Sequence, residues 1–169
     1  MEVTETAQVN VPDSALTSEE VIARNLRVVE AHFHNENPED IDKAIELYGP
    51  DIVWEAPSRG QVYTDPVEVK KAYLGIFRTI KYHKLTTLRR FATEDFVFDD
   101  QIGDVTVVGD EMPNLPYGPG TRMNARVVHC FQMKDGKIAR EIVYELFREF
   151  GGPSDKDCIP ADVHVEIFP

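Results

Sequence analysis

Apolar side chains recur every three or four positions in three segments of the first half of the chain. In residues 18–34 the repeating positions are Val21, Ile22, Leu26, Val29 and Phe33. Thr17 or Ser18 precedes two glutamates, as is typical of a helix N-terminus. Similar apolar stripes run through residues 38–48 and 66–80. This spacing predicts three helices.

The second half of the chain changes to the pattern of β-strands. Four segments are rich in β-branched and aromatic residues and are separated by turn signals: 85–92, 95–109, 121–134 and 137–149. A short segment, 52–56, also predicts a strand, and Asp135-Gly136 predicts a tight hairpin. Helices followed by a run of strands indicate an α+β fold, in which a cone-shaped, curved antiparallel sheet wraps around three helices. A ligand would bind in the mouth of the cone.

The length of 169 residues corresponds to about one domain. We expect a loose arm over residues 1–16, one folded domain over 17–150 and a tail over 151–169. Within the tail, residues 163–167 are a candidate for a late strand or for a contact with a partner subunit. The Pro/Gly-rich segment 109–121 is a candidate lid over a pocket.

The charge balance narrows the classes of partner. With 18 Lys and Arg against 30 Asp and Glu, the net charge of −12 repels phosphate backbones and anionic lipids. We therefore expect no nucleic-acid and no membrane partner. The chain has only two cysteines, Cys130 and Cys158, and an acidic N-terminal segment without an apolar stretch. These features predict a cytoplasmic protein.

One histidine stands out in segment 121–133. Alternate positions of this segment form a mostly apolar face, made of Met123, Ala125, Val127, His129, Phe131 and Met133. His129 is its one polar member. Burial disfavours the imidazolium, so His129 should be neutral near pH 7 unless a carboxylate lies beside it. It is a candidate general acid or base, and the alternative is a core histidine that is hydrogen-bonded to the backbone.

Two adjacent aspartates offer that carboxylate. Because Asp99 and Asp100 are neighbours on a strand, one of them should face inward in either register. We expect this to be Asp100, which shares a parity with Phe98 and could orient His129. The alternative is that both belong to a solvated acidic turn.

Four further residues are candidates with less definite positions. Glu55 lies beside Trp54 on the short strand, and parity leaves its direction open. His83 begins a strand and is a second candidate acid or base, with a surface histidine as the alternative. Arg59 and Tyr63 lie in a loop, where they could bind an anion or a hydroxyl group, with a solvated loop arginine as the alternative.

Cofactor motifs are absent from the sequence. It contains no GxGxxG, GxxxxGK[ST] or GxSxG pattern. His32 and His34 are two residues apart on a predicted helix and therefore point in different directions, which disfavours a metal chelate. We expect any catalysis to use neither a cofactor nor a metal.

Three local motifs resemble a known superfamily. They are Leu47-Tyr48-x-x-Asp51-Ile52-Val53-Trp54, Gly120-Thr121-Arg122, and Phe131-Gln132-Met133-x-Asp135-Gly136-Lys137-Ile138 with Glu141 beyond. Over residues 18–148 the chain is similar to the SnoaL-like branch of the NTF2-like superfamily. That superfamily includes ketosteroid isomerases, polyketide cyclases, scytalone dehydratases, dehydrochlorinases, epoxide hydrolases and non-enzymatic transport factors, so the resemblance implies the fold more than the activity.

The resemblance also implies roles for individual residues. His129 lies where isomerases and cyclases of this type keep an acid, and His83 lies where the dehydratases carry a proton-abstracting histidine. The dehydrochlorinase aspartate after the first helix is replaced by Asn35-Glu36-Asn37, and Glu55 precedes the isomerase-type base by one position. The retained histidines favour elimination, with His83 as the base and His129 as the acid, held by Asp100.

Some members of this superfamily release formaldehyde from lignin-derived diarylpropanes without a cofactor. By this resemblance we predict a cofactor-free lyase that acts on a hydroxylated aromatic or polycyclic compound. The predicted substrate-binding residues are Trp54, Arg59, Tyr63, Tyr82, Phe98, Phe131 and Tyr144. An isomerase or cyclase is the first alternative, and a non-catalytic binding module or accessory subunit is the second.

The other parity of segment 121–133 mixes Arg122 and Arg126 with Val128 and Cys130. A semi-polar sheet face of this kind is suited to packing against a second copy, so we expect a homodimer.

A cavity that holds His129 and a second titratable group would favour catalysis, whereas a filled core would favour a binding module.

Overall fold

The computed structural model describes residues 11–152 and 162–168. The order of elements is η2 (Asp13–Ala15), α1 (Ser18–His34), α2 (Ile41–Ile45), β1 (Tyr48–Ala56), η3 (Pro57–Arg59), β2 (Gln61–Tyr63), α3 (Pro66–Thr79), β3 (Ile80–Ala92), β4 (Phe96–Val107), β5 (Arg122–Lys134), β6 (Lys137–Glu149) and β7 (Val165–Ile167). The predicted α+β class, with a curved sheet and three α-helices in the described residues, is confirmed.

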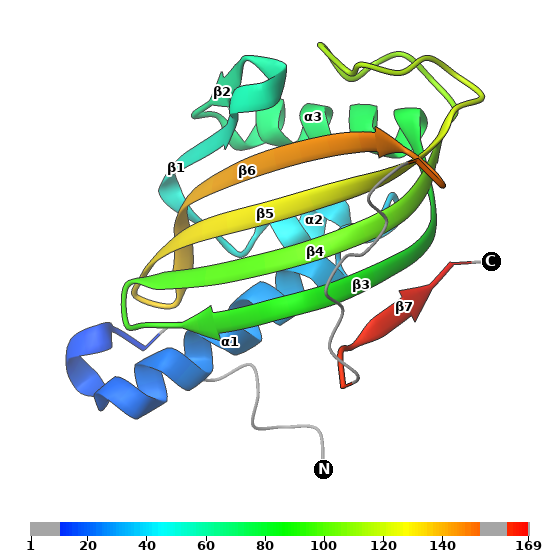
Figure 1. Cartoon of the computed structure of the whole chain (residues 1–169). Helices are drawn as coiled ribbons and strands as arrows, with labels where there is room; N and C mark the ends of the chain where they lie inside the picture. The colour runs from blue at the N-terminus through cyan, green and yellow to red at the C-terminus, as the bar shows by residue number, and fades with distance from the viewer. Residues whose placement is uncertain (1–10, 153–161, 169) are drawn as a thin grey trace.

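The sheet has the strand order β2-β1-β6-β5-β4-β3-β7. The long strands β3 to β6 pair in antiparallel fashion and curve over the helices, which lie on the concave side (Figure 1). One pair departs from the predicted antiparallel pattern, because β1 pairs with β6 in parallel. α3 and four strands, β2 to β5, separate β1 from β6 along the chain, and a long connection of this kind lets two strands run in the same direction.

Local sequence signals explain where the helices begin. Thr17 and Glu20 form a reciprocal capping box at the start of α1. At the start of α3, the Asp65 carboxylate accepts a hydrogen bond from the Val67 amide (2.8 Å), and Pro66 occupies the first turn. These signals place α1 and α3 close to their predicted bounds.

Three predicted assignments are wrong, each because strand pairing in the sheet outweighs the local sequence pattern. The helix predicted over 38–48 is limited to α2, and Tyr48 pairs with Ile138 as the first residue of β1. Strand β3 begins at Ile80, which pairs with Val107. The loop predicted to contain Tyr63 is the short strand β2, paired with β1.

The predicted hairpin between β5 and β6 is confirmed. Asp135 and Gly136 have φ values of 48° and 74°, the left-handed backbone that a two-residue hairpin turn requires. Asp13 docks on this turn: its amide donates to the Asp135 carboxylate and its carboxylate accepts from the Asp135 amide, both at 2.9 Å. The expectation of a loose arm is therefore wrong for residues 13–15, and residues 1–10 lie outside the described residues.

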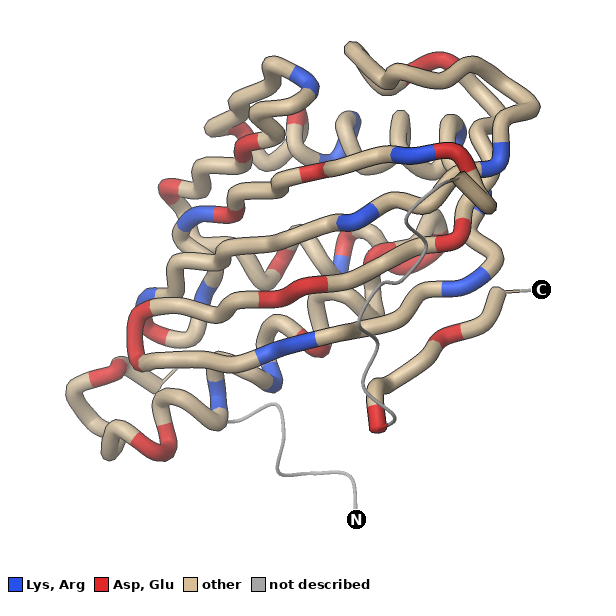
Figure 2. Tube along the Cα trace, in the orientation of Figure 1, with Lys and Arg blue, Asp and Glu red and all other residues tan. Residues whose placement is uncertain are grey.

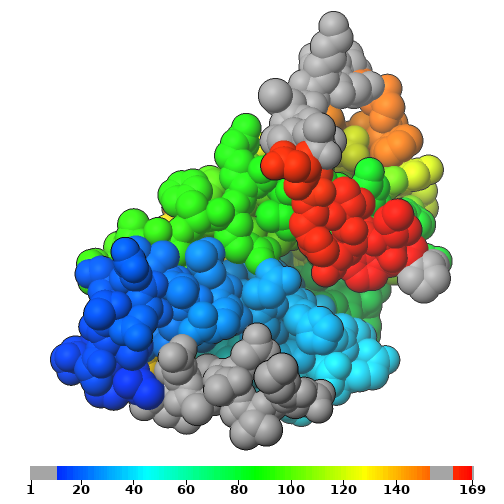
Figure 3. Space-filling view, turned by 90° about the horizontal axis from the view of Figure 1, so that it is seen from below, coloured from blue at the N-terminus to red at the C-terminus, as the bar shows by residue number. Residues whose placement is uncertain are grey.

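The predicted late strand is also confirmed, as β7. It pairs with β3, with Lys84 opposite Ile167, and the Phe168 amide donates to the His83 carbonyl (3.0 Å). Figure 3 shows this C-terminal segment, in red, against the green surface of the sheet and near the light-blue surface that follows α1. The rest of the tail, including Cys158, lies outside the described residues. Within those that are described, no helix is long and apolar enough to cross a membrane.

Candidate active site

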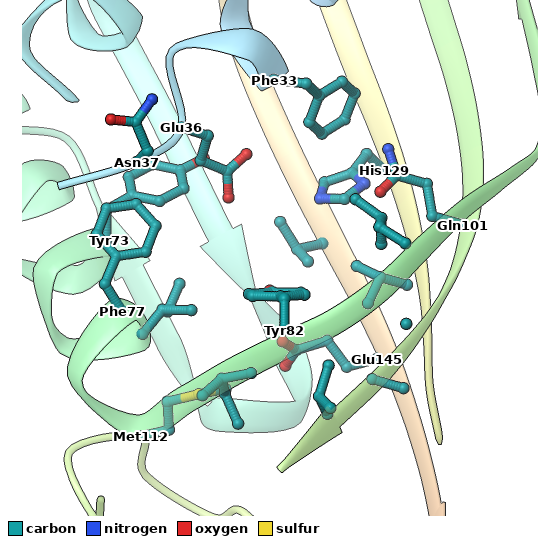
Figure 4. A pocket seen from close by; sticks show the side chains of 18 of the residues that line it. Phe33, Glu36, Asn37, Tyr73, Phe77, Tyr82, Gln101, Met112, His129 and Glu145 are labelled. Carbon is teal, nitrogen blue, oxygen red and sulfur yellow. The ribbon is translucent and has the colours of Figure 1, made fainter. Parts of the chain in front are cut away.

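A cavity of about 610 Å³ lies between the helices and the concave face of the sheet (Figure 4). Its volume is within the range of roughly 300–1,000 Å³ that is typical of small-molecule sites. Its lining includes residues 36–38, which follow α1, and residues 166–168 at the C-terminal end. The walls are mainly aromatic and aliphatic, and the main polar groups among them are Glu36, Arg59, Tyr82, Gln101, His129, Glu141 and Glu145.

His129 and Asp99 face each other across strands β5 and β4. The register places them directly opposite, so that both point to the concave face. His129 Nδ1 lies 3.6 Å from Asp99 Oδ2, and the two side chains are 8% and 0% exposed. Neither atom has a hydrogen-bond partner among the residues that the structure describes. Each is therefore the natural partner of the other, and the opposite edge of the imidazole faces the cavity beside Gln101 (Figure 4).

The electrostatic surroundings of His129 favour its protonated form. Burial alone would lower the pKa of the imidazole, but the Asp99 carboxylate, together with Glu141 and Glu36, outweighs burial and raises it. The condition attached to the sequence prediction therefore applies, because a carboxylate does lie beside His129. An imidazole whose pKa lies near the operating pH can both accept and return a proton.

Asp99 is fixed by an arginine on the next strand. Arg90 Nε donates to Asp99 Oδ1 at 2.6 Å, and Arg90 also pairs with Glu30. The guanidinium stacks over Phe33 at 5.0 Å from the ring centroid. Because Arg90 occupies one carboxylate oxygen, the other oxygen is left for His129. Figure 2 shows the acidic segment of β4 beside the basic segment of β3.

Glu36 supplies a second titratable group to the cavity. It follows α1 directly, and its side chain is 19% exposed. Burial raises its pKa from 4.5 to about 8, the nearby Glu141 and Asp99 add to this shift, and His129 and Arg59 oppose it. At neutral pH the Glu36 carboxyl is mainly protonated and can donate a proton.

A hydrogen-bonded cluster lies beneath Glu36. Tyr48 Oη donates to Glu141, and Tyr73 Oη donates to the same carboxylate at 3.1 and 3.2 Å. His32 Nε2 is 3.2 Å from Tyr73 Oη, 3.7 Å from Glu141 and 3.9 Å from Glu36. Burial and the Glu141 charge raise the pKa of both tyrosines, while burial lowers the pKa of His32. His32 therefore connects the two glutamates as a neutral ring.

Arg59 and Glu145 form a buried ion pair on the cavity wall. Arg59 Nε and Nη2 donate to the two oxygens of Glu145 at 2.9 and 2.7 Å, and both side chains are 5% exposed. The guanidinium lies 5.4 Å from the Trp54 ring centroid. Ser58 Oγ also donates to Glu145 Oε2 (2.8 Å). This pair places polar hydrogen-bonding groups on an otherwise aromatic part of the cavity wall.

The structure brings several of the predicted site residues together. His129, Trp54, Arg59 and Tyr82 line the cavity. Phe131 lies behind His129 with its ring nearly parallel to the imidazole, at a centroid distance of 5.6 Å. Tyr63 stacks on Trp54 and lines a smaller neighbouring pocket.

The expectation that Asp100 faces inward is wrong. Neighbouring strand residues point to opposite faces, so the inward position of Asp99 turns Asp100 to the convex side, where Arg126 and Arg89 bind it. Phe98 shares the face of Asp100 and therefore also lies outside the cavity. It stacks on Phe91 at a centroid distance of 5.0 Å. Tyr144 also lies on the convex face, opposite Val128, and is 50% exposed.

Glu55 and His83 also lie outside the cavity lining. Glu55 pairs with Arg140 on the outer side of β1. A register shift between Tyr82 and Lys84 interrupts β3, and there His83 Nε2 lies 2.8 Å from Thr106 Oγ1. The inward position at this irregularity belongs to Tyr82. The prediction of His83 as a cavity residue is therefore wrong.

Sequence reasoning gave no role to three acidic residues of the site, Glu36, Glu141 and Glu145, and it weighed Asp99 against Asp100 but favoured Asp100. Glu141 and Glu145 could have been identified from the sequence. They lie on the same face of β6 as Val143 and Phe147, and a charged residue on an apolar face indicates a functional site. The only sequence signal for Glu36 was its position after the end of α1. In the described part of the chain, no group of three or more His, Cys, Asp and Glu side chains is arranged to hold a metal ion.

Comparison with solved structures shows the same fold in several bacterial proteins. An LEH-like epoxide hydrolase from M. tuberculosis is 17% identical with a TM-score of 0.55, over 74% of this chain and 84% of that one. A candidate polyketide cyclase from Silicibacter sp. TM1040 is 16% identical with a TM-score of 0.61, over 74% and 90%. A ketosteroid isomerase-like fold from Catenulispora acidiphila, in complex with trimethylamine, is 12% identical with a TM-score of 0.57, over 69% and 83%.

The sequence itself was compared with curated proteins and with family models. No curated protein shows significant similarity to it. The model of the SnoaL-like domain matches residues 29–141, which is more than half of the chain and extends from α1 to Glu141 in β6. The chain therefore belongs to the SnoaL-like domain family of the NTF2-like superfamily.

Proposed function

We propose that this protein is a cofactor-independent lyase that uses general acid–base catalysis on a hydroxylated aromatic or polycyclic small molecule. The observation that carries the proposal is the buried Asp99–His129 pair, which opens into an aromatic-lined cavity of about 610 Å³. A second titratable group, Glu36, lines the same cavity. Two proton-transfer groups in one apolar cavity favour catalysis over a passive binding module.

His129 is the proposed base. Asp99 faces Nδ1 and would hold the ring so that Nε2 takes a proton from the substrate. The charge that forms on the imidazole is then stabilised by a carboxylate that Arg90 keeps in place. This assignment moves the base from His83, which lies outside the cavity, to His129.

Glu36 is the proposed acid. With its pKa raised to about 8, the carboxyl keeps a proton at neutral pH and can deliver it to a departing oxygen. His32 and Glu141 connect this carboxyl to the buried tyrosines. The cluster offers a route by which Glu36 could recover its proton after each turnover.

A 1,2-diarylpropane-1,3-diol illustrates how the two groups would act. Glu36 protonates the benzylic hydroxyl, which leaves as water and produces a cation stabilised by the adjacent ring. His129 removes the proton of the terminal hydroxymethyl O–H, the C–C bond to that carbon breaks, and formaldehyde leaves. The electron pair of the broken bond forms the stilbene double bond. The products are one stilbene, one water and one formaldehyde, so no oxidant is required.

The walls fit two aromatic rings. Phe33, Trp54, Phe77 and Tyr82 line the cavity, and aromatic side chains stack on aromatic ligands or meet them edge to face. A bulky two-ring substrate would fill a volume that a small acid would leave mostly empty. This favours the diarylpropane class within the broader proposal.

The test is to incubate the purified protein with a 1,2-diarylpropane-1,3-diol and to measure formaldehyde and stilbene by mass spectrometry. We expect equal amounts of both products without any added metal or nucleotide. Parallel incubations use a steroid enone and a linear polyketide. Conversion of either compound, with no formaldehyde from the diol, would reject the lyase and assign an isomerase or a cyclase.

We also propose that the protein is a cytoplasmic homodimer that packs through the convex face of the sheet. This face carries the semi-polar parity of β5 together with Tyr144 and Leu146 of β6, which are 50% and 69% exposed. Large exposed apolar side chains beside arginines are typical of protein–protein interfaces.

A further inference from the structure

We propose that the Arg59–Glu145 pair is the recognition site for a phenolic hydroxyl group, so that the enzyme selects substrates with a free 4-hydroxyaryl ring. This inference rests on the proposed function, because it names the substrate class of the same cavity. Figure 4 shows Glu145 beside Tyr82, apart from Glu36 and His129. One ring of a two-ring substrate could therefore dock here while the reacting carbons lie near the acid and the base.

The pair has one open donor and one open acceptor position. Arg59 uses Nε and Nη2 on Glu145, and Nη1 has no hydrogen-bond partner within residues 11–152 and 162–168. Nη1 is also not among the fully buried atoms that lack a partner. Glu145 Oε1 accepts one hydrogen bond, from Arg59, whereas Oε2 accepts two, from Arg59 and Ser58. A carboxylate oxygen can accept two, so Oε1 has room for one more.

A hydroxyl group matches these two positions, because it donates one hydrogen bond and accepts another. A carboxylate would meet the charge of Glu145, and an ammonium group would meet the charge of Arg59. Both charges are buried and already neutralise each other, so a neutral ligand adds no unpaired charge to the cavity. The pair therefore favours a hydroxyl over either ion.

The surrounding side chains select an aromatic hydroxyl over an aliphatic one. Trp54 lies under the guanidinium, and Tyr82 and Phe147 line the cavity near the pair. A flat ring can stack on such walls while its para-hydroxyl reaches the ion pair. A methyl ether at that position keeps an acceptor but loses the donor, and its methyl group would press against the Glu145 carboxylate.

The experiment measures binding without turnover. The probes are 4-hydroxystilbene and 4-methoxystilbene, neither of which carries a group that can be eliminated, and binding is followed by ligand fluorescence with the full chain. We expect the wild-type protein to bind the phenol on the order of 10- to 100-fold more tightly, because a polar site rejects an analogue that leaves it unpaired. In Glu145→Gln we expect this preference to fall to within about threefold.

Asp104→Asn is the matched control. Asp104 forms the same two-bonded pair with Arg122, but outside the cavity lining. This variant should keep the wild-type preference. If Glu145→Gln does not fold, the double variant Arg59→Met/Glu145→Leu replaces it, because removing both buried charges preserves folding better than removing one. The double variant should bind the two ligands equally or favour the ether.

Equal binding of phenol and ether by the wild-type protein would overturn the subsite, as would a preference that survives the loss of Glu145. Failure of both stilbenes to bind would overturn the subsite together with the two-ring substrate class. The proposed lyase fails separately: a phenol preference without formaldehyde release from the diol would leave the subsite standing and reject the reaction. Formaldehyde release without a phenol preference would support the reaction and reject the subsite.

Discussion

The two faces of strands β4 and β5 carry similar residues in different surroundings. On the convex face, Asp100 is bound by Arg89 and Arg126, which together engage both of its oxygens. On the concave face, Asp99 has one oxygen on Arg90 and the other 3.6 Å from His129. One carboxylate is saturated with donors and the other keeps an unsatisfied atom.

This contrast separates a carboxylate whose oxygens are both engaged by arginines from one that has an oxygen left for His129. The Arg126 and Arg89 contacts outweigh partial burial and lower the pKa of Asp100, so that it stays ionised. Asp99 instead acts on its neighbour, because it is one of the groups that raise the pKa of His129. Among the described residues, six buried side-chain polar atoms lack a hydrogen-bond partner: four belong to His32, Trp54, Asp99 and His129, and two belong to Arg24 and Gln61. Such atoms are uncommon in folded proteins and indicate a functional site.

The largest expected effect on kcat distinguishes His129, which lines the cavity, from His83, which lies outside the lining. His129→Gln should lower kcat for formaldehyde release by about 10²- to 10⁴-fold, the usual contribution of one acid–base group. His83→Ala should leave kcat within about twofold of the wild type, because His83 lies outside the cavity lining. Circular dichroism checks the fold of both variants. Equal rate losses in the two would mean that the cavity is not the site of reaction.

Glu36→Gln should lower kcat on the order of 10²-fold and change the pH profile. In the wild type, activity should rise as His129 loses its proton, at a pH above the ordinary imidazole pKa, and fall again near pH 8, where Glu36 ionises. The alkaline decline should disappear in the variant. If activity still declines near pH 8 in Glu36→Gln, the decline comes from another group and Glu36 is not the acid.

The same substitution should alter stability in a defined pH window. Between pH 4.5 and about 8 the folded protein holds a proton on Glu36 that the unfolded chain has released. The free energy of unfolding should therefore decrease with rising pH, by up to about 1.4 kcal/mol per pH unit from this group. Glu36→Gln should lack this slope, as measured by urea unfolding at several pH values. A parallel pH dependence in variant and wild type would contradict the raised pKa.

A smaller effect is expected on the convex face. Leu146→Glu places a charge on the exposed apolar surface and should convert a dimer into a monomer without changing the fold of the protomer. Sedimentation velocity at micromolar concentration distinguishes the two states. A wild-type protein that sediments as a monomer would exclude the proposed dimer.

Most of the fold could be predicted from local signals. The apolar spacing of α1 and α3, the alternation in β5 and the Asp-Gly turn depend on neighbours in the sequence. The parallel β1–β6 pair and the short α2 could not be predicted, because they result from strand pairing between distant segments. Among the cavity residues, His129 could be predicted from the parity of its strand, whereas Trp54 was predicted through the family resemblance.

The errors in the site have two physical origins, the choice of the inner face and an irregular strand register. Parity defines which residues share a face but not which face is the inner one. The apolar Phe98 predicts that its side of the strand is the inner one, whereas Phe98 stacks on Phe91 on the outer face. Asp99 and Asp100 were exchanged by that choice. For His83, an irregularity in β3 shifted the register, and alternation cannot predict such a shift.

The most direct test of the account compares the two adjacent aspartates. Asp99→Asn and Asp100→Asn are assayed for kcat with the diarylpropanediol at the optimum pH, and ¹⁵N NMR follows the titration of His129 in both. We predict that Asp99→Asn lowers kcat on the order of 10²-fold and lowers the pKa of His129, while Asp100→Asn keeps kcat within about twofold. Equal rates in the two variants, or a His129 titration that is unchanged by Asp99→Asn, would contradict the account.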